Sequence, residues 1–296
     1  MASLILALVL MTAASFGFAG GAIFQHRSIR AEQDGGEHRA LSPRQLLLQL
    51  REPSWLLGLG MLGGGSVLHM IALSQAPVSV VQPIGILAVP WSVLLASRIH
   101  GYATSRAVWL SVAVTIAGVA GFTAVSTHVS SGHAAEVDEL MLGLYVGVCA
   151  TIAGALLLLH SRVAPAFRSL VMASGGAVLF GLTSALLKAL LVQLGGAERG
   201  AVPVMVLTGA GVLATAVLGA WMIQQAYALG HPEVVVGAMT TVDPIVAVVF
   251  GLMVLGEGVH LHVLTIAAMA ALGTISTLGV ASLARHHPEV LRRDAR

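Results

Sequence analysis

The sequence predicts an all-α polytopic membrane protein of nine transmembrane helices, arranged as two inverted four-helix repeats joined by a linker helix. Three observations predict this fold class. The composition is 57% hydrophobic and only 9% charged. Apolar stretches of about 20 residues, the length a helix needs to cross a bilayer core, recur along the chain. The basic residues are also distributed unevenly among the connections between these stretches. Such a composition excludes an ordinary soluble globular protein.

The nine predicted spans follow one another with short connections, so no room is left for a separate soluble domain. The first is not expected to be a signal peptide, because no charged residue precedes Arg27. The spans are Leu4–Phe24, Trp55–Ser74, Val78–Ser97, Ala107–Ser126, Leu140–Leu159, Ser169–Gln193, Pro203–Ile223, Val234–Leu255 and His260–Leu283.

The Lys and Arg residues predict the orientation. Thirteen of the 15 fall in the odd connections and the C-terminal tail; the exceptions are Arg199 and Lys188, which lies within the sixth span. By the positive-inside rule, the N-terminus lies outside and the C-terminus in the cytoplasm of a plasma or inner membrane. No clustered basic face predicts binding of nucleic acid. The thirteen are Arg27, Arg30, Arg39, Arg44, Arg51, Arg98, Arg106, Arg162, Arg168, Arg285, Arg292, Arg293 and Arg296.

Two connections have features of their own. The longest, residues 25–53, contains Ser42 and Pro43, a helix start signal, followed by four leucines before Glu52. We expect a short amphipathic helix there, lying at the membrane surface. The outside loop Thr127–Glu139 is acidic and contains histidines; a solvated loop is favoured over a weak metal site. Glu257, after the eighth span, is expected to lie in a solvated loop.

An internal repeat relates the first four spans to the last four. Phe16-Gly17 in the first span recurs as Phe180-Gly181 in the sixth. Equivalent helices are five spans apart and therefore cross in opposite directions, as in secondary transporters with a midplane site. The domains are residues 1–126 (first repeat), 127–168 (loop and linker helix) and 169–296 (second repeat and tail). Prolines precede and interrupt the third and eighth spans: Pro77 and Pro90, and Pro232 and Pro244.

Small residues at four-residue spacing predict close contacts between helices, because backbones approach where side chains are small. The first span has Ala13, Gly17 and Gly21, and the second has Gly60 and Gly64.

Asp243 is the leading candidate for a functional residue, since a charge inside a span is costly and usually faces a cavity. Thr240 and Thr241 precede it, and Pro244 follows and frees the carbonyl of Thr240. These groups predict a cation or proton site, with Asp243 as the candidate metal ligand. The alternative is a protonated carboxyl group hydrogen-bonded to a neighbouring helix.

Lys188, the other charged residue within a span, either extends to the interface or takes part in function. Gln82, beside Pro83, and His69 are further candidate site residues, with hydrogen bonding between helices as the alternative. The same alternative is favoured for the glutamines at the cytoplasmic ends of the first and seventh spans. The predicted helix breaks are Pro83, Pro90 and Pro244.

The sequence contains no HExxH, GxSxG, CxxC or GxxxxGK[ST] motif, so we expect neither an enzyme nor a cofactor. Without an ATP site, transport runs on a gradient or is passive. The single cysteine, Cys149, excludes a disulfide framework.

Three stretches carry a resemblance to a known family: Ala14–Ser28, Pro53–Arg98 and Gly176–Leu190, the last reading GAVLFGLTSALLKAL. On these motifs the chain resembles the drug/metabolite transporter superfamily and is most similar to the NIPA-type magnesium transporters, whose expected layout has nine spans and an outside N-terminus. Ser66 and His69 stand where that family tends to have a glutamate and an asparagine.

Three functions stay open. The first is a secondary transporter or facilitator that carries Mg²⁺ or another divalent cation, with Asp243 binding the ion and the residues around it forming irregular walls. The second is a proton-coupled exporter of a small organic metabolite or drug, and the third a non-transporting membrane scaffold. The expected partners are the lipid bilayer and a small ion or molecule, and a homo-oligomer is left open.

Overall fold

The computed structural model describes residues 2–32, 41–100, 105–129, 137–195, 202–230, 232–256 and 262–285. Within these ranges the chain is helical and has no strands. Seven helices are long and apolar enough to cross a membrane, and two shorter apolar helices, Gly237–Met253 and Val263–Gly279, accompany them. The prediction of an all-helical, multi-pass membrane protein is therefore confirmed, whereas the count of nine crossings stays a prediction. The seven are Ser3–Ile29, Pro53–Gln75, Val78–Leu95, Arg106–His128, Glu139–Leu159, Phe167–Gly195 and Val202–Leu229.

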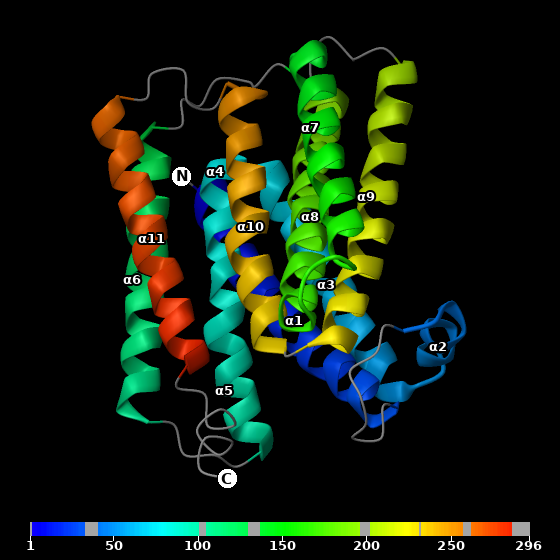
Figure 1. Cartoon of the computed structure of the whole chain (residues 1–296). Coiled ribbons are helices and arrows are strands. Elements are labelled where there is room, and N and C mark those ends of the chain that lie inside the picture. Colours follow the sequence, from blue (N-terminus) through cyan, green and yellow to red (C-terminus); the bar gives the residue numbers. More distant parts are fainter. Residues whose placement is uncertain are drawn as a thin grey trace.

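The long helices run alternately in opposite directions, so that successive connections lie at opposite ends of the bundle (Figure 1). They pack in pairs: α1 on α3, α8 on α9, α6 on α11, and α10 on α8. Their bounds are α1 Ala2–Glu32, α3 Pro53–Gln75, α6 Arg106–Val129, α7 Glu139–Leu159, α8 Pro165–Gly195, α9 Val202–Leu229, α10 Pro232–Met253 and α11 Val263–Arg285.

The third predicted span is not one continuous helix. It consists of α4 (Val78–Val81), the 3₁₀ helix η1 (Gln82–Leu87) and α5 (Ala88–His100). Pro83 lies at the start of η1, where the α-helical hydrogen-bonding pattern changes. Pro90 does not end its helix, because α5 continues through it to His100.

Pro244 does not end its helix either, since α10 continues through it. A proline within a helix removes one hydrogen bond to the carbonyl four residues earlier. Neighbouring helices and side chains hold such a helix together within a membrane bundle. The effect predicted for Pro244 is therefore confined to the carbonyl of Thr240.

Glycines bring α1 and α3 into close contact. A Cβ atom on Gly17 would lie 2.9 Å from the carbonyl oxygen of Met61, and one on Gly58 would lie 2.9 Å from that of Gly21. The contacts predicted for Gly17 and Gly21 are therefore confirmed. The prediction for Gly60 and Gly64 is wrong, because a Cβ on either would meet no atom of the described residues within 4 Å. Ala13 is also exposed. Four-residue spacing identifies a stripe of small residues but not the side that a neighbour covers.

The two Phe-Gly pairs do not occupy equivalent positions. Gly17 meets α3, whereas a Cβ atom on Gly181 would lie 2.7 Å from the carbonyl oxygen of Asp243 in α10. Gly176, five residues earlier, meets the carbonyl oxygen of Gly219 in α9. The position in α8 that corresponds to Gly17 is thus nearer to Gly176.

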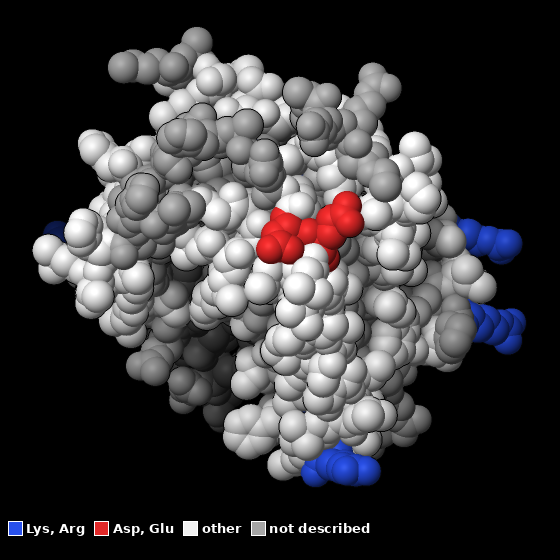
Figure 2. Space-filling view, turned by 90° about the horizontal axis from the view of Figure 1, so that it is seen from above, with Lys and Arg blue, Asp and Glu red and all other residues white. Residues whose placement is uncertain are grey.

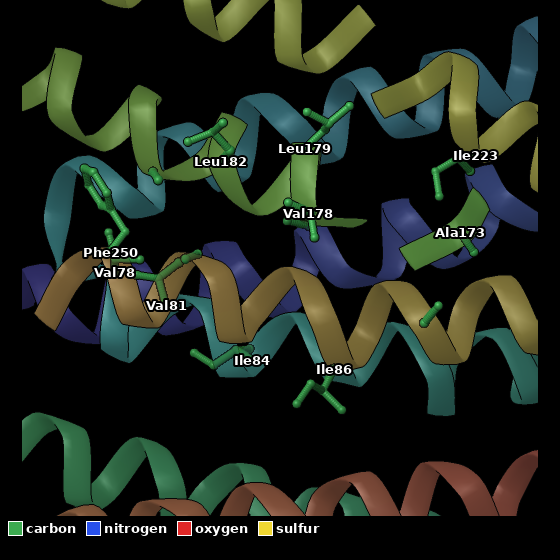
Figure 3. Close-up of a cluster of buried hydrophobic side chains, with 14 of the residues drawn as sticks. Val78, Val81, Ile84, Ile86, Ala173, Val178, Leu179, Leu182, Ile223 and Phe250 are labelled. Atoms are coloured by element: carbon green, nitrogen blue, oxygen red, sulfur yellow. The ribbon is translucent and has the colours of Figure 1, made fainter. Parts of the chain in front are cut away.

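The apolar interior lies where α4 and η1 meet α8 and α10 (Figure 3). Phe250 of α10 is fully buried and lies close to Val78 and Val81 of α4. Leu182 of α8, with 1% of its surface exposed, faces the same region. This cluster fixes the positions of the helices that carry the candidate site.

Charge differs between the two ends of the bundle. Asp138 and Glu139 lie at the start of α7, and the view onto that end shows acidic side chains in the middle and basic ones only at the rim (Figure 2). The exposed arginines lie near connections at the opposite end: Arg27, Arg44, Arg51, Arg98, Arg106 and Arg162. The asymmetry agrees with the predicted orientation, which stays a prediction.

Some expectations fall outside the described residues. They concern residues 130–136 of the predicted outside loop, Glu257, Arg39, Arg199 and the tail after residue 285. The predictions for them, and the division into residues 1–126, 127–168 and 169–296, stay untested.

Candidate functional site

Asp243 lies on the interior face of α10. Ala247 and Phe250 follow it at helical spacing on the same face, and both are fully buried. This face packs on α4, η1 and α8. Gly181 of α8 allows the approach, because any side chain there would collide with the carbonyl oxygen of Asp243. The candidate site thus lies where the second half of the chain meets the interrupted third span.

The carboxylate of Asp243 is incompletely bonded. Its Oδ1 atom is buried and has no hydrogen-bond partner among the residues that the structure describes. Burying a polar atom without a partner costs about 1–3 kcal/mol, and more when the group is charged. The alternative interpretation of Asp243, a protonated carboxyl group hydrogen-bonded to a neighbouring helix, requires such a partner. None is found for Oδ1 among the described residues. A proton, a water molecule or a cation would complete it.

The two threonines differ in their relation to Asp243. Thr240 lies three residues before it and shares its face, whereas Thr241 lies two residues before it and is turned about 160° away. The hydroxyl of Thr240 donates to the carbonyl of Gly237 at 3.2 Å, within α10. Pro244 has no N–H of its own to donate to the carbonyl of Thr240. Thr240 therefore belongs with the carboxylate, and Thr241 does not.

Gln82 lies at the junction of α4 and η1, two elements on which α10 packs. Its side chain is 3% exposed, and Nε2 has no hydrogen-bond partner within the described ranges. His69 lies on α3, with its ring edge-on to Phe18 of α1 at a centroid distance of 6.1 Å. Gln82 therefore lies in the region of the candidate site, and His69 belongs to the contact between α1 and α3.

Lys188 stabilises the end of a helix. Its Nζ donates to the carbonyl oxygens of Leu73 at 2.7 Å and Ala76 at 3.0 Å. Pro77 lacks the N–H that would otherwise reach the carbonyl of Leu73, so that carbonyl needs another donor. A cation is also favourable at a helix C-terminus. Lys188 thus joins α8 to the end of α3, which favours a structural role.

Sequence reasoning missed Tyr145 of α7. Its hydroxyl donates to the carbonyl of Val246, and its ring lies edge-on to Phe250 at 5.4 Å. Both partners belong to α10, so the linker helix is attached close to Asp243. The one aromatic residue of this span was the available signal, since a buried tyrosine hydroxyl needs a partner.

Two hydroxyl groups on α6 were also missed. Thr123 and Ser126 are buried, and their oxygens have no hydrogen-bond partner among the described residues. The face of α6 around Gly118 packs on α11, so the remaining buried face is turned toward α4 and η1. Threonine and serine are common in membrane helices, and sequence gives no sign that these two lack partners.

Glutamines connect helices at the opposite end of the bundle. Gln224 Nε2 donates to Gln25 Oε1 at 2.7 Å, and Gln225 Nε2 donates to the carbonyl of Leu41 at 2.9 Å. The N–H of Leu41 donates in return to Gln225 Oε1 at 2.8 Å. The expected hydrogen bonding between helices is confirmed for Gln25 and Gln224, whereas Gln225 bonds to Leu41, in the connection before α2.

The structure describes no group of three or more His, Cys, Asp or Glu residues that would hold a metal ion within the ranges it covers. Asp243 is the one carboxylate among the candidate site residues. A hard cation at this place would take its other oxygen ligands from carbonyls, hydroxyls, an amide or water.

Comparison with known proteins gives a relative but no function. No family model matches the chain, and no solved structure gives a significant match. An uncharacterised protein of Corynebacterium glutamicum is 30% identical over 268 residues, which cover 87% of each chain.

Proposed function

This chain belongs to the same family as the uncharacterised protein of Corynebacterium glutamicum, and we propose that it is a secondary transporter or facilitator of the drug/metabolite transporter type. Its substrate is Mg²⁺ or another divalent cation, and it acts in a plasma or inner membrane with its N-terminus outside. The observation that carries this proposal is the buried oxygen of Asp243 without a hydrogen-bond partner in the described chain.

The position of Asp243 within an apolar helix supports a functional role. Charged side chains within membrane helices are costly, by about 2.5–3.5 kcal/mol on insertion scales, and they mark ion pathways and proton relays. The face that carries Asp243 packs on η1, a segment without regular α-helical hydrogen bonds. Irregular backbone at membrane depth is typical of transporter sites, because its carbonyl groups are free to bind an ion.

The packing of the helices supports two repeats. In the first half α1 packs on α3 and on the interrupted third span; in the second half α8 packs on α9 and on α10. One helix remains in each half, α6 in the first and α11 in the second, and these two pack on each other. This leaves α7 as the linker between two four-helix units, and Asp243 close to the boundary between them.

The ligand chemistry suits a weakly held, hydrated divalent ion. Mg²⁺ prefers oxygen ligands and usually keeps several water molecules, so one carboxylate with carbonyl and amide oxygens suffices for transient binding. Asp243, the carbonyl of Thr240 and the amide of Gln82 supply such groups. The resemblance to NIPA-type proteins points to the same ion.

Magnesium entry into proteoliposomes tests the proposal, with a Mg²⁺-sensitive dye inside the vesicles. Asp243→Asn keeps the size of the side chain and removes its charge, so we expect flux to fall to the level of empty vesicles. Asp138→Asn is the matched control, since Asp138 is exposed and caps the start of α7. Wild-type flux through Asp243→Asn would overturn the assignment of the site. A folded wild type without flux would overturn the magnesium substrate.

A proton-coupled exporter of a small organic molecule is the second candidate. The lone carboxylate favours it, because a single proton neutralises Asp243 fully and no metal-binding group of three lies in the described ranges. This function predicts flux that follows a pH gradient and ignores divalent cations. Absence of any flux, with Asp243→Ala affecting stability alone, would indicate the scaffold.

A further inference from the structure

The short helix α2 (Pro43–Gln49) begins as the sequence predicts. Ser42 caps it: its hydroxyl accepts from the backbone N–H of Gln45, and the side chain of Gln45 accepts from the N–H of Ser42. The chain continues in helical conformation to Leu50. This geometry fixes which side chains share a face.

One face of α2 is basic at both ends and apolar between them. Leu47 and Leu48 follow Arg44 at spacings of three and four residues, which places these three side chains on one side of the helix. Arg51 comes directly after the helical residues, and its backbone N–H donates to the carbonyl of Leu48 at 2.9 Å. All four are exposed, Leu47 by 65% and Leu48 by 44%. Leu50, close to this face, is 47% exposed.

The opposite face of α2 is already used inside the protein. Gln49 is 1% exposed, and its Oε1 accepts from the hydroxyl of Ser28 in α1 at 2.7 Å. Just before the helix, Leu41 is 4% exposed and bonded at both its N–H and its carbonyl to Gln225 of α9. Residues 41–50 are thus attached to both halves of the chain, and the exposed leucines are not needed for internal packing.

The position of α2 indicates what covers the leucines. It projects sideways from the bundle at the end where the exposed arginines gather, and basic side chains extend beyond the rim when the bundle is seen from above (Figures 1 and 2). A helix beside the end of a membrane bundle lies at the level of the lipid headgroups. Exposed leucines flanked by arginines match that layer, since leucine enters the acyl boundary and arginine reaches phosphate.

We propose that the exposed face of α2 docks on anionic lipid headgroups of the cytoplasmic leaflet, and that this contact holds residues 41–50 against α1 and α9. The arginines contact headgroup phosphates, and the leucines lie in the acyl boundary. The proposal does not depend on the transported substrate or on whether the protein transports at all. Its cytoplasmic assignment rests on the positive-inside rule.

Hydrogen exchange in nanodiscs tests this docking. The full chain is placed, one copy per disc, in phosphatidylcholine alone or in phosphatidylcholine with phosphatidylglycerol. We expect the amides of residues 41–50 to exchange about thirtyfold more slowly in the anionic discs, as two arginines near an anionic surface would produce. Because Leu41 N–H is itself one of the attaching bonds, its exchange reports release directly.

Matched variants separate docking from general charge. In the double variant Arg44→Gln/Arg51→Gln the difference between the two lipids should disappear. The control Arg106→Gln/Arg162→Gln removes two exposed arginines of the same end outside α2 and should keep it. A melting curve for each variant shows that it is folded.

Two results would overturn the proposal. One is equal exchange of residues 41–50 in both lipids, and the other is a lipid difference that survives in the Arg44→Gln/Arg51→Gln variant. A third result would also overturn the proposal, namely slower exchange of residues 41–50 only in discs that hold two copies. It would indicate that a second copy of the chain covers the exposed face of α2.

Discussion

Two glycines of α3, two residues apart, should respond to the same substitution in opposite ways. A Cβ atom on Gly58 would lie 2.9 Å from the carbonyl oxygen of Gly21 and 3.1 Å from the backbone nitrogen of Gln25, both in α1. A Cβ atom on Gly60 would meet nothing within 4 Å. Alanine is favoured over glycine within a helix by about 1 kcal/mol, so Gly60→Ala should be neutral or stabilising by up to about 1 kcal/mol.

Gly58→Ala gains the same helix preference, but α1 must move away from α3 to admit the methyl group. Overpacking of this kind costs about 1–3 kcal/mol, and two of the three nearest atoms are backbone atoms that no side-chain rotation can clear. The net effect is a loss of up to about 2 kcal/mol, which leaves Gly58→Ala about 1–3 kcal/mol less stable than Gly60→Ala.

Reversible unfolding in mixed micelles, followed by helical circular dichroism, measures both variants against the wild type. Gly64→Ala provides a second control, because a Cβ there also meets no atom within 4 Å. Equal stability of Gly58→Ala and Gly60→Ala, or the reverse order, would refute the close approach of α1 and α3.

The remaining predictions concern three side chains that connect elements by hydrogen bonds. Lys188→Met should destabilise the protein by about 2–4 kcal/mol, because two carbonyls at the end of α3 lose their donor, and unfolding in mixed micelles measures this. Gln225→Leu removes both bonds to Leu41 and should speed hydrogen exchange of residues 41–50 in every lipid; unchanged exchange would contradict it. Tyr145→Phe keeps the ring and removes the bond to Val246, so it should cost about 1 kcal/mol in the same unfolding assay.

Local signals in the sequence were sufficient for most of the long helices and for the start of α2. Ser42 and Pro43 predicted the first turn of α2, because capping depends on residues within one turn. The apolar stretches predicted the long helices, since their length matches the bilayer. Asp243 stood out because its charge lies within such a stretch, and the structure places it on an interior face.

Contacts between distant segments could not be predicted in this way. Lys188 was recognised as unusual, but its partner carbonyl is exposed by Pro77, more than 100 residues earlier in the chain. Both Pro83 and Pro90 were candidates for the break in the third span, and only the structure shows the 3₁₀ turn beginning at Gln82. The unpaired oxygens of Thr123 and Ser126 are likewise a property of packing, because sequence does not show which hydroxyl lacks a partner.

The isolation of Asp243 determines what kind of binding this site supports. One carboxylate balances half the charge of a divalent ion, and the carbonyl of Thr240 and the amide of Gln82 contribute dipoles rather than charge. Tight capture of Mg²⁺ takes more ligand charge, whereas a conducting site must bind weakly enough to release the ion. A hydrated ion passing a single carboxylate meets that requirement, and so does a proton that neutralises it. Asp243→Asn therefore abolishes flux in both cases, and substitution of the pH gradient for the magnesium gradient separates them.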